Sequence, residues 1–263
     1  MNEPDKQIAL VPFQPTELTK VGASSLIVRG LADLTVRVEA EEWLKKGLDF
    51  HSKLQWKEAY ACFERGIRLN PNHPELQIWL GNMLTNGEGV RQDYTQAALW
   101  WRKAAEQGYA KAQWNLGVAY DSGQGVTQDY AQSALWWFKA AEQGLSDAQC
   151  WLGTAYQSGQ GVTQDYMQAV FWWRQAAEQG LADAQWNLGA AYDSGQGVTQ
   201  DYTQAVFWWR KAAEQGQGRA QRDLGTAYWN GEGVTEDDTQ AAFWWRKAAE
   251  QGYEEALAAL RNM

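Results

Sequence analysis

The sequence predicts an all-α protein built as a solenoid of stacked helix pairs. Three observations predict this fold. The dipeptide Leu-Gly recurs five times at intervals of 36 residues, from Leu80 to Leu224. Apolar residues in each block follow helical spacing, and glycines with an Asp-x-x-Gln pair punctuate each block at the same places. Because one block cannot bury its apolar stripe alone, neighbouring blocks must stack.

Residues 1–38 match no repeat. The segment Ile8 to Pro15 is apolar but contains two prolines, so it cannot be helical throughout. Further on, Ile27, Leu31, Leu34 and Val38 fall at helical spacing. They predict a short helix that covers the open face of the first repeat. A competing interpretation makes residues 8–15 a docking peptide, or a strap along the solenoid.

Residues 40–73 carry a different pattern, made by Trp43, Gly47, Phe50, Ala59, Phe63 and Pro71. This segment resembles a single tetratricopeptide repeat. Lys46 stands where that pattern has Leu, and Gly66 where it has Ala. The resemblance implies one helix pair that continues the same solenoid.

Five units of 36 residues follow, at 74–109, 110–145, 146–181, 182–217 and 218–253. In the second unit, Ala112, Leu116 and Tyr120 lie on one stripe of a helix, which a Gly-x-Gly turn ends. The second helix of that unit ends at Gly144, a typical C-terminal glycine. Each unit is therefore a helix, a Gly-x-Gly turn, a second helix and a glycine.

Each second helix begins at an aspartate whose side chain should accept from the free N–H groups of the first turn. The pairs are Asp93/Gln96, Asp129/Gln132, Asp165/Gln168, Asp201/Gln204 and Asp237/Gln240. The same helices carry paired tryptophans, which we expect to fill the core and the space between repeats. The pairs are Trp100/Trp101, Trp136/Trp137, Trp172/Trp173, Trp208/Trp209 and Trp244/Trp245.

The pattern Ala-x-x-x-Leu-Gly-x-x-Tyr-x-x-Gly-x-Gly-Val, followed by Asp-Tyr-x-x-Ala-x-x-Trp-Trp-x-Lys-Ala-Ala-Glu-Gln-Gly, resembles the Sel-1-like repeat family over residues 74–263. The resemblance implies a right-handed superhelix of antiparallel helix pairs and a role as an adaptor or scaffold in protein complexes. Residues 254–263 begin a sixth unit, and Ala256 and Leu260 predict a C-terminal capping helix.

The net charge of −9 lies in the array, because residues 1–73 carry ten basic and ten acidic residues. An acidic surface repels nucleic acid and favours neutral or basic partners. The sequence contains no apolar run of 18 residues and no basic start of a signal peptide, so we expect neither a membrane span nor export.

The two cysteines, Cys62 and Cys150, are far apart and predict neither a disulfide framework nor a zinc site. Some secreted bacterial members of the Sel-1-like family carry a cysteine pair in each repeat. This chain does not, which favours a reducing compartment, and we expect a cytoplasmic protein.

Catalytic motifs are missing from the sequence, so we expect no enzyme, no cofactor and no metal. The Gly-x-Gly turn lacks the following Gly-Lys-Ser/Thr of a phosphate loop and recurs in every unit. His51 and His73 have no ligand spacing, and we expect surface or turn residues. The carboxylates recur by copying of the repeat, whereas a catalytic pair should be unique. A hydrolase is therefore the least favoured function.

The first helices should line a groove, with one face of each turned to a ligand. Tryptophan alternates between two neighbouring positions of that face, with acids and amides beside it. The candidate residues for partner binding are Trp79, Lys111, Trp114, Asn115, Asp121, Asp147, Trp151, Asp183, Trp186, Asn187, Asp193, Arg222 and Trp229. A competing interpretation packs these tryptophans between adjacent first helices.

By resemblance to tetratricopeptide repeats, Asn115 and Asn187 should contact the main chain of a bound peptide. The predicted function is a non-catalytic adaptor or scaffold that binds a neutral or basic polypeptide segment, as a subunit or regulator of a larger bacterial complex. The alternative is a carbohydrate-binding module, since tryptophan ladders also stack on sugars. The sequence leaves the oligomeric state open.

Overall fold

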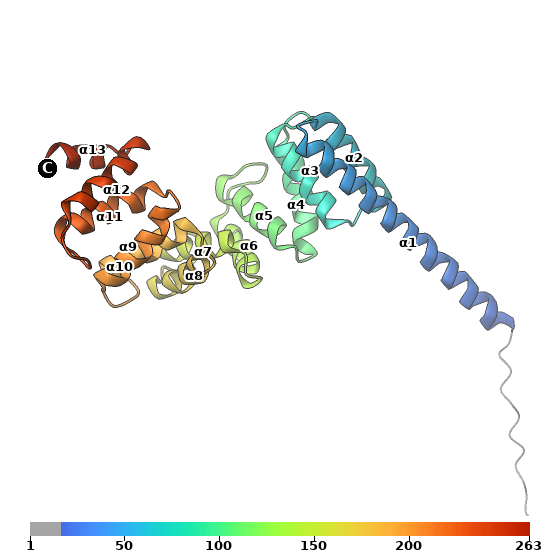
Figure 1. The fold of residues 1–263 in the computed structure, drawn as a ribbon. Coiled ribbons are helices and arrows are strands. Elements are labelled where there is room, and N and C mark those ends of the chain that lie inside the picture. The colour runs from blue at the N-terminus through green and yellow to red at the C-terminus, as the bar shows by residue number, and fades with distance from the viewer. Residues whose placement is uncertain (1–16) are drawn as a thin grey trace, which may run out of the picture. The chain divides into compact units, whose positions relative to one another are not determined.

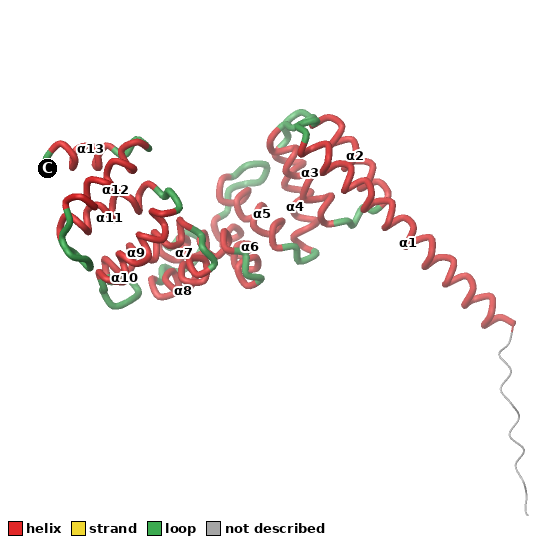
Figure 2. Tube along the Cα trace, viewed as in Figure 1, coloured by secondary structure: helices red, strands yellow, loops and turns green. Residues whose placement is uncertain are grey.

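The computed structural model describes residues 17–263, with side chains from residue 34 onward. The predicted docking segment at 8–15 lies outside the described residues. Residues 17–263 form thirteen helices and no strand (Figure 2), so the all-α fold class is confirmed. The chain divides into two compact units, residues 1–73 and residues 74–263, and each is described by itself.

The first unit is a pair of helices, α1 (Glu17–Ser52) and α2 (Trp56–Leu69). The predicted short helix ending at residue 38 is wrong, because α1 continues without a break to Ser52. The sequence from Leu31 to Lys46 contains no glycine or proline that would end it. Leu34 and Val38 are 57% and 52% exposed, so they do not bury the predicted apolar stripe.

The core of the first unit lies where α1 and α2 cross closely. Phe63 is fully buried, and a Cβ on Gly47 would lie 2.6 Å from its Cδ1. Only a glycine lets the Phe63 ring approach α1 so closely. Trp43 lies beside two cations, with Lys46 Nζ and Arg65 Cζ both 4.7 Å from its ring centroid.

His73 lies at the end of a turn, as expected, with its backbone N–H donating to the carbonyl of Asn70 at 3.1 Å, but it is not a surface residue. It is 6% exposed, and its Nε2 lies 3.0 Å from Oε1 of Glu41. This contact joins the end of the unit to α1. His51 is half-buried, with its ring 4.7 Å from that of Trp56.

The second unit is a run of five helical hairpins followed by one helix (Figure 1). We call the two helices of a hairpin its first and second helix. The first helices are α3 (Pro74–Asn86), α5 (Ala110–Ser122), α7 (Ser146–Ser158), α9 (Ala182–Ser194) and α11 (Gly218–Asn230). The second helices are α4 (Tyr94–Glu106), α6 (Tyr130–Glu142), α8 (Tyr166–Glu178), α10 (Tyr202–Glu214) and α12 (Asp238–Glu250). Each helix packs on the next along the chain.

The predicted helix boundaries in the second unit are confirmed. In α6, Oδ1 of Asp129 accepts from the backbone N–H of Gln132 at 3.0 Å, and the equivalent aspartate caps each of the other four second helices. Gly144, after α6, has a φ of 86°, a left-handed conformation that favours glycine.

A tryptophan and a glycine hold the two helices of each hairpin together. In the third hairpin, a Cβ on Gly153 would lie 2.6 Å from Cδ1 of Trp173. The five equivalent tryptophans are all buried: Trp101, Trp137, Trp173, Trp209 and Trp245. The indole occupies the space that a side chain on the glycine would fill. The glycine of each Leu-Gly dipeptide and the second tryptophan of each pair therefore pack directly against each other. The prediction of core tryptophans is confirmed at these positions.

Buried glutamines join successive hairpins, a device that the sequence analysis did not predict. Gln113, 4% exposed, donates from Nε2 to the carbonyl of Ala105 at 3.2 Å and accepts from Gln143 Nε2 at 2.8 Å. Buried polar groups are costly unless they are hydrogen-bonded. The acceptor role of this glutamine recurs in all five hairpins, so it fixes one helix against its neighbours throughout the array.

The last helix, α13 (Glu254–Arg261), packs on α12. Ala256 is fully buried beside Trp245, Tyr253 and Leu260. Across residues 17–263, no helix combines the length and the apolar character that crossing a membrane requires.

Candidate functional site

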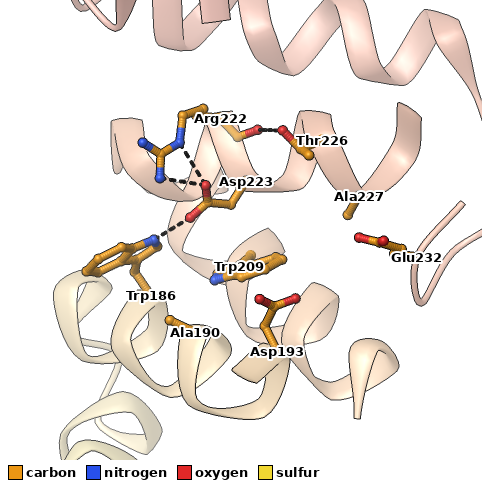
Figure 3. A pocket seen from close by; sticks show the side chains of 9 residues that line it. All are labelled: Trp186, Ala190, Asp193, Trp209, Arg222, Asp223, Thr226, Ala227 and Glu232. Atoms are coloured by element: carbon orange, nitrogen blue, oxygen red, sulfur yellow. Dashed lines mark hydrogen bonds and ion pairs between the residues drawn. The ribbon is translucent and has the colours of Figure 1, made fainter. Parts of the chain in front are cut away.

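Two adjoining recesses lie along the first helices of the third, fourth and fifth hairpins. The wide recess, about 580 Å³, is lined by Cys150, Trp151, Thr154, Gln157, Asp183, Trp186, Asn187, Gln217, Arg219 and Tyr253. The acidic recess, about 350 Å³, is lined by Trp186, Ala190, Asp193, Trp209, Arg222, Asp223, Thr226, Ala227 and Glu232 (Figure 3). Trp186 lines both, and we call the two recesses together the groove.

Six of the thirteen predicted site residues line this groove: Trp151, Asp183, Trp186, Asn187, Asp193 and Arg222. Trp151 is 45% exposed, and its ring lies 5.3 Å from that of Trp137. One face of Trp151 therefore packs on the core while the rest is available to a ligand. Asp183 is exposed and accepts from Gln217 Nε2 at 3.3 Å.

Trp186 is held in place on two sides. Its Nε1 donates to Oδ2 of Asp223 at 2.7 Å, and Arg219 lies over its ring, 4.9 Å from the centroid. Asp223 also accepts from Arg222, whose Nη2 lies 2.7 Å from Oδ1. Because Trp186 and Asp223 belong to successive hairpins, these bonds fix the wall that the two recesses share.

The other predicted residues lie outside the groove. Trp114 is half-buried and packs against the core cluster that contains Trp137 and Leu152, with its Nε1 buried, in keeping with the competing interpretation. Trp79 is half-buried, and Trp229, 39% exposed, lies 5.9 Å from Trp245. Exposed positions without a part in either recess are Lys111 and Asp147.

Asn115 and Asn187 were predicted to bind the main chain of a peptide, but their side-chain amide nitrogens donate to groups within the array. Asn115 Nδ2 donates to Oδ1 of Asn82 at 3.0 Å, and Asn187 Nδ2 lies 3.7 Å from Sγ of Cys150. Each bond links the first helices of successive hairpins. Asn187 still lines the wide recess, whereas Asn115 does not.

Carboxylates and one thiol have shifted pKa values in this region. Burial raises the pKa of Asp193, and the nearby Glu232 and Asp223 raise it further. Burial alone raises the pKa of Asp121. Burial, followed by the charge of Asp183, raises the pKa of the Cys150 thiol to about 12. That thiol is protonated at neutral pH, so it is no nucleophile.

Burial lowers the pKa of Arg222, but the hydrogen bond that Arg222 donates to Glu255 and the charge of Asp223 outweigh this, and the pKa is raised. Its Nη1 lies 2.6 Å from Oε2 of Glu255 on α13. The Arg222 cation is therefore shared between two carboxylates on one side of the acidic recess.

A third, narrow recess of about 70 Å³ lies two repeats earlier in the chain. It is lined by Asp121, Tyr130, Ser133, Trp137, Trp151, Thr154, Ala155 and Gln160. Asp121 thus faces a hollow too, but a much smaller one, which the Trp151 ring also lines.

Residues of the groove that were not predicted to line it include Trp209, which was assigned to the core, and Glu232 in the acidic recess, and Arg219 in the wide recess. Glu232 stands between the two glycines of a turn that was interpreted only as a helix boundary. A signal was present, since that middle residue is Glu88, Gln124, Gln160, Gln196 or Glu232 in the five units. Variation at a copied position indicates a residue that the fold does not fix.

The five hairpins match a known family of repeats. The model of the Sel1 repeat matches residues 74–109, 110–145, 146–181, 182–217 and 218–253. One similar structure is c5321, a protective antigen present in uropathogenic Escherichia coli strains displaying an SLR fold, with 38% identity and a TM-score of 0.79. The match covers 84% of this chain but 48% of c5321, so this chain spans about half of that protein.

A second similar structure is a Sel1 repeat protein from Oxalobacter formigenes. It is 32% identical with a TM-score of 0.76, over 83% of this chain and 86% of that one. No curated protein matches the chain.

Proposed function

Because the chain belongs to the Sel1 repeat family, whose helical repeats generally act as protein–protein interaction scaffolds, we propose that it is a non-catalytic adaptor. Its groove holds an extended polypeptide segment of a partner protein. The adaptor is a subunit or regulator of a larger bacterial complex, in keeping with the bacterial sources of the two similar structures.

The observation that carries this proposal is the half-exposed Trp151 beside the wide recess. An indole that is 45% exposed and borders a recess of about 580 Å³ offers a large apolar contact. Tryptophan is enriched among the residues that contribute most to protein interfaces. Thr154, Gln157 and Asn187 supply polar groups around it, which suits a peptide with alternating polar and apolar contacts.

The charge of the groove favours a neutral or basic segment. Asp183, Asp193 and Glu232 line it, and the array carries the whole net charge of −9. Such a surface repels nucleic acid. We also propose a cytoplasmic location, which the two free, buried cysteines support.

The test is Trp151→Ala, with Met167→Ala as the control. Met167 lies on α8, is 71% exposed and borders neither recess. The partner is first captured from the native cell by the full chain and then purified, and its affinity is measured for each variant. We expect Trp151→Ala to weaken binding about ten-fold or more, as for a central interface tryptophan, and Met167→Ala to leave it unchanged.

Circular dichroism controls for folding, and hydrogen exchange of the complex gives an independent readout. We expect new protection on α7, α9 and α11. Unchanged affinity for Trp151→Ala, with protection confined to the second helices, would show that the groove is not the binding site. Competition by an oligosaccharide, in place of a peptide from the partner, would favour the carbohydrate alternative.

A further inference from the structure

The acidic recess has aromatic walls and three carboxylates. Figure 3 shows Asp193 from α9, Asp223 from α11 and Glu232 from the following turn around the indoles of Trp186 and Trp209. An aromatic hollow rimmed by carboxylates matches a cation, which gains from both the ring faces and the charges.

Two of the three carboxylates are free to meet a ligand. Asp223 is engaged by Trp186 Nε1 and by Arg222, which also pairs with Glu255. Within the part of the chain that the structure describes, the carboxylates of Asp193 and Glu232 have no hydrogen-bond or ion-pair partner. The charge of Asp223 is balanced by Arg222, whereas the charges of Asp193 and Glu232 are not balanced within the recess, which is therefore negatively charged.

Trp209 gives a second, independent indication of a ligand. It is 7% exposed, and among the described residues its Nε1 has no hydrogen-bond partner. The equivalent Trp173 and Trp245 each donate to a backbone carbonyl at 3.2 Å, whereas the equivalent Trp137 Nε1, like that of Trp209, is buried and has no partner among the described residues. The Nε1 edge of Trp209 is turned toward Trp186 (Figure 3). A buried donor is costly without an acceptor, and the recess beside Trp209, about 350 Å³, has room for one, whereas the recess beside Trp137 is only about 70 Å³.

A ligand that satisfies the recess must bring a cation and a hydrogen-bond acceptor together. A basic residue within a polypeptide does so, with its side chain for the carboxylates and a main-chain carbonyl for Trp209. We propose that the acidic recess is a subsite for a lysine or arginine residue of the segment bound in the groove. This subsite rests on the proposed function, because the segment reaches it through the wide recess.

The chain contains the same chemistry within itself. Arg219 covers one face of Trp186 from the side of the wide recess, at 4.9 Å from the ring centroid. A guanidinium from the partner would use the acidic recess in a similar way, with Asp193 and Glu232 in place of solvent. Burial and the two neighbouring carboxylates raise the pKa of Asp193, and a bound cation would relieve that repulsion.

A metal ion satisfies the recess less well. No group of three or more His, Cys, Asp or Glu side chains among the described residues is arranged to hold one. A metal ion also brings no acceptor for Trp209 Nε1. The basic side chain accounts for both the carboxylates and the indole, so the geometry favours it.

The test is an NMR titration of the full chain with its tryptophan indoles ¹⁵N-labelled. The probes are Nα-acetyl-arginine N-methylamide and the corresponding lysine compound, with Nα-acetyl-norleucine N-methylamide as the uncharged control. We expect saturable shifts of the Trp209 and Trp186 indole N–H signals with the two basic probes only. The larger response identifies the preferred side chain.

Asp193→Asn with Glu232→Gln should weaken binding of the basic probes about ten-fold, because two charge-assisted contacts are lost. Glu178→Gln with Glu214→Gln removes the same charge from exposed positions outside the recess and should leave binding unchanged. Equal shifts with the norleucine probe, or an unchanged affinity in Asp193→Asn with Glu232→Gln, would overturn the subsite. So would displacement of the arginine probe by millimolar MgCl₂ at constant ionic strength.

The proposed subsite and the proposed groove can be disproved independently of each other. If no basic probe binds while Trp151→Ala still weakens the partner, the subsite is wrong and the groove stands. If the arginine probe binds at Trp209 while Trp151→Ala leaves the partner's affinity unchanged, the groove is wrong and the recess is a separate site for basic residues.

Discussion

The narrow recess and the acidic recess are built from equivalent positions, 72 residues apart in the sequence. Their volumes are about 70 Å³ and about 350 Å³. The positions that line both recesses are Asp121 and Asp193, Trp137 and Trp209, Trp151 and Asp223, Thr154 and Thr226, Ala155 and Ala227, and Gln160 and Glu232. Four of these six positions keep their residue and two change, and each change places a carboxylate in the larger, acidic recess.

The position of Trp151 and Asp223 accounts for most of this difference. Trp151 lays its ring on Trp137, 5.3 Å away, and closes the narrow recess. Asp223 is too small to cover Trp209 and instead accepts from Trp186 Nε1 at 2.7 Å. The equivalent donor, Trp114 Nε1, is buried and has no partner among the described residues. The lesson is that the fold depends on what the repeats share, whereas binding depends on where they differ.

The largest expected effect concerns the two buried tryptophans under these recesses. Trp137→Ala and Trp209→Ala should each lower the free energy of unfolding by about 3–5 kcal/mol, because each leaves a cavity opposite a glycine. Trp137→Ala should cost about 0.5–1.5 kcal/mol more, since it also removes the aromatic pair with Trp151. Urea unfolding followed by circular dichroism measures both.

Equal losses of stability in the two variants would mean that the Trp151 ring contributes nothing to the core. The two recesses would then differ in shape but not in their contribution to stability. Trp173, in the hairpin between them, is an internal reference for both variants. It packs on Gly153 in the same way, but its Nε1 is hydrogen-bonded.

The fold was predictable because its determinants are local and copied. The Asp129 cap, the Gly144 turn and the contact of Gly117 with Trp137 each involve residues within one unit. Five copies in register repeat each signal. The first unit shows the limit, since no repeat marked where α1 begins, and the helix runs through the predicted boundary at residue 38.

The candidate site was predictable only in outline, because its contacts cross from one unit to the next. Trp186 was recognised, but its partner Asp223 belongs to the following hairpin. Asn115 was expected to bind a peptide, yet its amide meets Asn82, and no pattern within its own unit could indicate that. The burial of Trp114 depends in the same way on a neighbouring hairpin.

A smaller effect is expected from transplanting the acidic recess. Trp151→Asp with Gln160→Glu opens the narrow recess and places carboxylates at the positions of Asp223 and Glu232. The new carboxylate at position 151 should accept from Trp114 Nε1, as Asp223 does from Trp186. We expect the Trp137 indole signal to respond to Nα-acetyl-arginine N-methylamide, with a gain in affinity of about ten-fold over the parent at this position.

Trp151→Asn with Gln160→Glu is the matched control, because it opens the same space with one carboxylate fewer. Its response to the arginine probe should be clearly weaker. A transplant that binds no better than this control would show that the charge at position 223 does not define the acidic recess.

The smallest expected effect is a pH-dependent difference in stability. The folded pKa of Asp193 is raised above the ordinary value of 3.8, first by burial and then by Glu232 and Asp223. A group with a raised pKa contributes stability that is fully present below its unfolded pKa and is lost as the pH rises through the folded pKa. Asp193→Asn should therefore be more stable than the parent at pH 7, and the gain should shrink toward pH 4.

We expect this gain to stay below about 1 kcal/mol, because the Asp193 carboxylate is only half-buried and solvent screens its repulsion. Asp121→Asn should gain less, since burial is the only cause of its raised pKa. Urea midpoints between pH 4 and pH 7 measure both variants, and a larger gain for Asp121→Asn would contradict the role of the neighbouring carboxylates. If Asp193→Asn is both more stable and weaker in binding the arginine probe, then the acidic recess contains a destabilising carboxylate for which a cation from a partner would compensate.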